Sequence, residues 1–151
     1  MPHEPHRRRS FLRRHSLSLI VFAILALWFF LYLGADPQTH IGAFYGNAIA
    51  DWTGTFVIVI LTKYFFELGS HESRKLPVSA HGLRGLRLFW LDHSLTIVLI
   101  LTGALWVALY VNIDSNGKAG QVIGNIVSEW TQVLGLVLIT KYTTEIGSKE
   151  G

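Results

Sequence analysis

The sequence predicts an all-α integral membrane protein with four transmembrane helices, arranged as two tandem helical hairpins that repeat in parallel topology. Three observations support this fold class. Half of the 151 residues are hydrophobic and only 15% are charged, whereas a soluble domain carries about 25% charged residues. The apolar residues are gathered into long runs. The second half of the chain also repeats the first.

The repeat aligns residues 42–70 with residues 120–148 without a gap, at an offset of 78 residues. Residues 15–36 match residues 93–114 at the same offset. The positions that recur in the first stretch are Gly42, Gly46, Asn47, Trp52, Thr53, Thr62, Lys63, Tyr64, Glu67, Gly69 and Ser70, while Asp51 returns as Glu129. So many residues in one register indicate an internal duplication.

Composition excludes several function classes. The chain has no cysteine, which excludes disulfides, thiolate metal sites and cysteine nucleophiles. A pI of about 9.4 could suggest nucleic acid, but the cations cluster beside apolar runs, as membrane orientation requires. No nucleophile elbow, phosphate loop, zinc helix or dinucleotide fingerprint is present. We therefore expect neither an enzyme nor a nucleic-acid partner.

The first half of the chain predicts one hairpin behind a basic arm. Residues 1–14 hold five arginines and form a cytoplasmic arm at the anionic membrane surface. The first span covers about residues 15–34 and the second about residues 42–67, with a short connection free of Lys and Arg between them. Residues 15–70 thus form the first transmembrane hairpin.

The second half predicts another hairpin after a basic connection. Residues 71–92 form a cytoplasmic connection, and their last part interleaves arginines with Leu, Phe and Trp, as in a short interfacial helix. The third span covers about residues 91–111 and the fourth about residues 120–145. Residues 93–148 thus form the second transmembrane hairpin, and residues 149–151 form a tail.

Basic residues crowd the N-terminus, the central connection and, more weakly, the C-terminus. The positive-inside rule therefore places both termini and the central connection in the cytoplasm. Because each repeat has two spans, the copies run in parallel topology about an axis along the membrane normal.

Small residues recur at a spacing of four at the start of the second and fourth spans. Gly42 and Gly46 share one helical face, as do Gly120 and Gly124. Small residues at this spacing let helix backbones approach closely in lipid. We interpret these glycines as helix-packing positions.

Two acids lie within the spans. Asp51 follows Asn47 by four residues, and Glu129 follows Asn125 in the same way. A carboxylate at the bilayer centre costs about 3 kcal/mol on insertion scales, so a retained one is a functional candidate. A pseudo-two-fold axis would bring the acids together to share a proton or bind a cation, with the asparagines as neutral ligands. Alternatively, both acids lie near the wet outer interface, where the positive end of their own helices favours them.

A second repeated set of polar residues is predicted at the cytoplasmic face. It comprises His15, Lys63 and Glu67 in the first hairpin and His93, Lys141 and Glu145 in the second. Antiparallel packing would make them a ring of ion pairs that sets hairpin register, and a proton relay through the histidines is the alternative. Haem ligation is disfavoured because both histidines lie at span ends beside charges. We expect no cofactor and no metal.

Three short strings resemble a family of small bacterial membrane proteins known only as a domain of unknown function. They are HSLS at residues 15–18, Asp51 with Trp52, and GSHESR at residues 69–74. In that family a span opens with N-[SG]-L-S, and E-N-W and G-S-x-E-S-K follow. This chain has His for Asn, and its acid directly precedes the tryptophan. The resemblance implies a bacterial inner membrane but no activity.

Two functions agree with these features. The first is a pore or transporter for a proton or small cation, with Asp51 and Glu129 lining the path and a homo-oligomer supplying further walls. The second is a non-catalytic accessory or structural subunit of a larger membrane complex, which the small-residue stripes and the basic arm favour.

Overall fold

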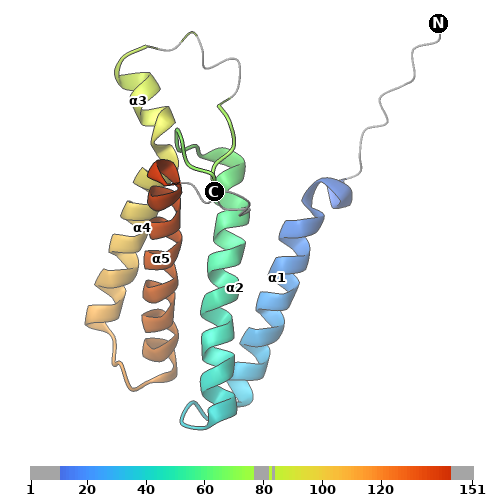
Figure 1. The fold of residues 1–151 in the computed structure, drawn as a ribbon. Helices are drawn as coiled ribbons and strands as arrows, with labels where there is room; N and C mark the ends of the chain where they lie inside the picture. The colour runs from blue at the N-terminus through green and yellow to red at the C-terminus, as the bar shows by residue number, and fades with distance from the viewer. Residues whose placement is uncertain (1–10, 77–81, 83, 144–151) are drawn as a thin grey trace, which may run out of the picture.

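The computed structural model describes residues 11–76, 82 and 84–143, and the regular elements in that part of the chain are five α-helices (Figure 1). Their bounds are α1 Phe11–Gly34, α2 His40–Tyr64, α3 Leu86–Asp92, α4 Ser94–Asn112 and α5 Lys118–Tyr142. Residues 15–34 of α1 and all of α2, α4 and α5 are long and apolar enough to cross a membrane. The prediction of an all-α membrane protein with four candidate spans is therefore confirmed.

The four long helices pack in the order α1, α2, α5, α4, which Figure 1 shows as neighbouring ribbons. The short connections α1–α2 and α4–α5 lie at one end, here called the short-loop end, and the α2–α3 connection lies at the other, the long-loop end. Helices α2 and α5 both run from the short-loop end to the long-loop end. The central contact is therefore made by two parallel helices.

The buried core lies between α2, α4 and α5. Leu95, Leu99 and Val137 are fully buried, and the indole of Trp130 packs beside them. Its Nε1 donates to the carbonyl oxygen of Leu99 at 3.1 Å and to the hydroxyl of Thr102 at 3.0 Å. Most of α1 instead exposes large apolar side chains, which is the expected surface of a helix that faces lipid.

The helix ends differ from the predicted spans. Helix α2 ends at Tyr64, three residues before Glu67, and α5 ends at Tyr142. Phe65 leaves the helix with extended backbone angles, and Arg74 donates to the end of α2 through bonds to the carbonyl oxygens of Thr62 and Lys63. The predicted end of the second span at Glu67 was therefore wrong, and Glu145 lies outside the described residues.

The two basic segments that precede the hairpins differ in structure. The prediction of a short helix before the third span is confirmed by α3, which has seven residues and is separated from α4 by His93. Leu86, Phe89 and Trp90 are exposed on it. In the first half, by contrast, residues 11–14 form the first turn of α1. A single continuous helix thus leads from this part of the arm into the first span.

Candidate functional site

The two short connections adopt the same turn. The carboxylate of Asp36 accepts a bond from the backbone N–H of Gln38 at 2.9 Å, and that of Asp114 accepts one from Asn116 at 3.0 Å. A Cβ added at Gly42 would overlap the carbonyl oxygen of Asp36, and one at Gly120 would overlap that of Asp114. These glycines therefore let the chain return closely against its own turn rather than against a neighbouring helix.

The second glycine of each stripe faces the preceding helix. A Cβ at Gly46 would lie 3.4 Å from the ring of Tyr32, and one at Gly124 would lie 2.9 Å from the ring of Tyr110. Each tyrosine comes from the other helix of the same hairpin. The packing that these glycines allow is thus within a hairpin.

The structure brings the two asparagines and the two acids together between α2 and α5. Asn125 donates through Nδ2 to Oδ1 of Asn47 at 2.5 Å. One helical turn further along, the carboxyl groups of Asp51 and Glu129 lie within hydrogen-bonding range of each other. They are termed the acid pair below. An open cavity of about 460 Å³ at the short-loop end is lined by Ala43, Gly46, Asn47, Tyr110, Ser115, Gly120, Gln121, Gly124 and Asn125.

The acid pair lies near the middle of its helices. Asp51 follows the start of α2 by 11 residues and precedes its end by 13, which correspond to about 16 Å and about 20 Å of helix. Glu129 has the same position in α5. Asp51 is exposed in the single chain, whereas Glu129 is half-buried, with its Oε2 3.4 Å from the position of a Cβ at Gly54.

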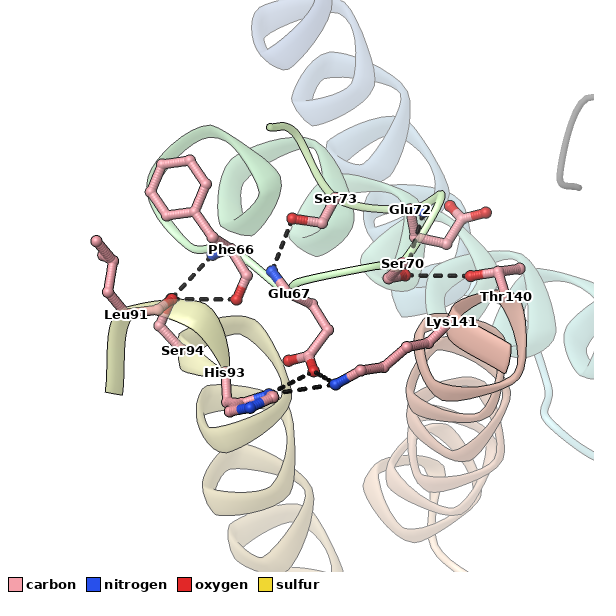
Figure 2. Close-up of polar contacts among 10 residues, drawn as sticks. All are labelled: Phe66, Glu67, Ser70, Glu72, Ser73, Leu91, His93, Ser94, Thr140 and Lys141. Carbon is pink, nitrogen blue, oxygen red and sulfur yellow. Dashed lines mark hydrogen bonds and ion pairs between the residues drawn. The ribbon is translucent and has the colours of Figure 1, made fainter. Parts of the chain in front are cut away.

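The polar residues of the long-loop end form two groups. His15 Nδ1 lies 2.9 Å from Lys63 Nζ. In the second group, here called the Glu67 cluster, Glu67 Oε1 lies 2.8 Å from His93 Nδ1 and 2.7 Å from Lys141 Nζ (Figure 2). Glu67 therefore contacts the histidine that precedes α4 and the lysine near the end of α5.

A short extended segment places Glu67 there. Residues 65–70, here called the strap, cross the beginning of α4 (Figure 2). Leu95 donates its N–H to the carbonyl oxygen of Phe66 at 2.9 Å, and the N–H of Phe66 donates to Ser94 Oγ at 2.9 Å. The strap thus satisfies the Leu95 N–H, which the first turn of α4 leaves free, and the next residue of the strap, Glu67, is buried.

The charge of Glu67 is held by its neighbours. Its side chain is only 1% exposed, and burial by itself raises the pKa of a carboxyl group. The bonds from Lys141 and His93 and the charge of Lys141 outweigh burial, so the pKa of Glu67 lies below its ordinary value. The cluster therefore keeps a buried carboxylate ionised at neutral pH.

Sequence reasoning missed the contact that joins α1 to α5 at the short-loop end. Lys118 donates through Nζ to the carbonyl oxygens of Tyr32 and Leu33, at 3.2 and 3.1 Å, and the Tyr32 hydroxyl donates to the Lys118 carbonyl at 3.2 Å. At the offset of the predicted repeat, the residue that corresponds to Lys118 is His40. The contact is therefore not repeated, and the motif carried no signal for it.

No protein-family model, curated protein or solved structure matches the chain. The resemblance to small bacterial membrane proteins accordingly stays a prediction. Within the described residues, no group of three or more His, Asp or Glu side chains could hold a metal ion.

Proposed function

We propose that this membrane protein provides a pathway for a proton or a small cation, with the acid pair as the groups that bind it. The observation that carries the proposal is the contact between Asp51 and Glu129 near the middle of two parallel, span-length helices. Two carboxyl groups in contact share a proton or bind a cation more readily than they carry two charges. Asn47 and Asn125 add neutral oxygen ligands one turn away.

The proposed architecture is a duplicated hairpin, with both termini on the cytoplasmic side of a bacterial inner membrane. Contacts that recur at the repeat offset support the duplication. The His15–Lys63 contact returns as His93–Lys141 at 3.3 Å. Both histidines also lie against an aromatic ring one turn earlier in a tilted arrangement, with ring centroids 4.5 and 4.8 Å apart. The cations beside the spans support the orientation.

Access to the acid pair is proposed from the short-loop end. The open cavity there reaches the asparagine pair, one turn from the acids. On the other side, towards the long-loop end, Leu61 of α2 and Val137 of α5 belong to the apolar core. An apolar layer resists the passage of ions and protons, so a complete passage requires a rearrangement of these helices.

The exposure of Asp51 favours an assembly. In a single copy its carboxylate would meet lipid at mid-span, at a cost of about 3 kcal/mol. A second copy of this chain that packs over α2 and α5 removes this cost and supplies another wall for the pathway. We therefore propose a homo-oligomer as the working form.

The test is flux through the purified protein in liposomes. We expect proton or monovalent-cation flux that is abolished when Asp51→Asn is combined with Glu129→Gln. The matched control is Asp114→Asn, which removes a carboxylate of the short-loop end but keeps an oxygen for the N–H of Asn116. Flux that is absent, or unchanged in the double variant, refutes the pathway.

The same preparation addresses the second function. The exposed mid-span position of Asp51 would equally be covered by a helix of another protein, as expected of an accessory subunit of a larger complex. The accessory function is favoured if flux is absent and a partner protein co-purifies in stoichiometric amount. Loss of this partner on Asp51→Leu would show that the partner covers the acid.

A further inference from the structure

A pocket beside the strap is separate from the acid pair. It measures about 630 Å³ and is lined by Phe66, Glu67, Leu68, Gly69, Ser70, His71, Ser73, Arg74, Lys75 and Leu76. These residues directly follow the end of α2. The pocket therefore lies where a membrane span leaves the hydrocarbon, at the depth of lipid headgroups.

Internal bonds hold the pocket in shape. The N–H of Glu67 donates to Ser73 Oγ at 2.8 Å, and the hydroxyl of Ser70 lies 3.1 Å from that of Thr140 (Figure 2). Gly69 turns the chain with a φ of +84°, a conformation that suits glycine. A site held in place by such bonds requires little ordering when a ligand binds.

The charges of the pocket favour an anion. Arg74 is held by its bonds to the carbonyl oxygens at the end of α2 and lies over the ring of Phe66, 5.6 Å from its centroid. Lys75 is exposed beside it. The Glu67 carboxylate is already neutralised by Lys141 on its inner side, and within the described part of the chain Arg74 and Lys75 form no ion pair with an acid.

The walls indicate which anion fits. Phe66, Leu68 and Leu76 give the pocket an apolar part, and Leu68 is 55% exposed. A ligand that joins a phosphate to hydrocarbon matches both parts, and basic pockets at the ends of membrane helices bind anionic lipid headgroups. We infer that this pocket binds the headgroup of an anionic phospholipid, with the phosphate diester on Arg74 and Lys75 and the upper acyl chain on Phe66 and Leu68.

The inference is tested with the whole protein in detergent, titrated with phosphatidylglycerol and followed by native mass spectrometry. Lys75→Gln is the decisive variant, because Lys75 is exposed and its removal leaves the bonds at the end of α2 intact. We expect about five-fold weaker binding of phosphatidylglycerol, the size expected for one cation near a lipid surface, and weaker binding again with Arg74→Gln. Phosphatidylcholine should bind weakly to every variant.

The matched control is Arg87→Gln on α3, an exposed cation of the same connection outside the pocket. An equal loss with Arg87→Gln would mean diffuse attraction and would overturn the inference. Inorganic phosphate that competes through the same two residues as strongly as the lipid would also overturn it, in favour of a free-anion site. The outcome is independent of ion flux, so this inference and the proposed pathway fail separately.

Discussion

Replacing Glu67 by glutamine tests whether the Glu67 cluster holds the two halves of the molecule together. Glu67 follows α2. Its partner His93 directly precedes α4, and its partner Lys141 belongs to α5. The substitution keeps the shape of the side chain and removes its charge. We expect these helices to lose their main electrostatic link at the long-loop end.

The magnitude follows from burial. The Glu67 side chain is 1% exposed and that of Lys141 16%, so water screens the pair only slightly. Removing one member of a buried ion pair costs about 3–5 kcal/mol. Because glutamine retains an oxygen for Lys141 and because Lys141 is partly solvated, the expected cost is about 3 kcal/mol. Adding Lys141→Met to Glu67→Gln should recover at least about 1 kcal/mol of this cost.

The free energy of unfolding is measured in mixed micelles by denaturing-detergent titration. Glu72→Gln is the matched control, because Glu72 belongs to the same connection and its carboxylate points away from the cluster in Figure 2; it should cost less than about 0.5 kcal/mol. Equal effects of the two substitutions would refute the reasoning. So would a double variant that shows no coupling between Glu67 and Lys141.

The pH dependence of the same measurement has a definite sign. The pKa of Glu67 is lowered in the folded protein, so its ionised form stabilises the fold at every pH above the ordinary glutamate value of about 4.3. This stabilisation is lost as the pH falls below that value and through the folded pKa. The gap between wild type and Glu67→Gln should stay constant near neutrality and close in acid. A gap that widens in acid contradicts the assignment.

Three further substitutions test the packing. Gly42→Ala should destabilise the fold by about 2 kcal/mol, because a Cβ there overlaps the backbone of Asp36. Gly135→Ala should instead stabilise α5 by up to about 1 kcal/mol, because a Cβ there meets nothing within 4 Å. Equal melting temperatures of the two variants would contradict the turn geometry. Trp130→Phe should lower the free energy of unfolding by about 1–2 kcal/mol, because the bond to the carbonyl oxygen of Leu99 is lost. A detergent-unfolding midpoint equal to that of the wild type would show that this bond does not stabilise the fold.

The four spans could be predicted from the sequence, because apolar runs of that length are typical of transmembrane helices. The residues at which the helices end could not be predicted. Phe65 and Phe66 are as apolar as the helix before them, and the chain leaves the helix where Phe66 bonds to Ser94 and Leu95, which are distant in sequence. Hydropathy contains no information about such a partner.

The candidate site was likewise predictable only in part. A spacing of four placed Asn47 with Asp51 on one face, and the repeat suggested which residues would lie opposite; the structure brings these pairs together. The neighbours of Glu67 could not be derived, because hairpin pairing suggested His15 whereas the strap carries the side chain to His93. Whether the acids transport anything stays a prediction.

The strap also has a consequence for biosynthesis. Glu67 emerges from the ribosome 26 residues before His93 and 74 residues before Lys141. During that interval the first hairpin carries a carboxylate whose counter-charges have not been synthesised. We therefore expect this end of the newly inserted half to stay open to water, and the fold to close late, when the last helix has been made. A ribosome-bound chain truncated before Lys141 should accordingly be cleaved by protease at the strap, where the finished protein resists.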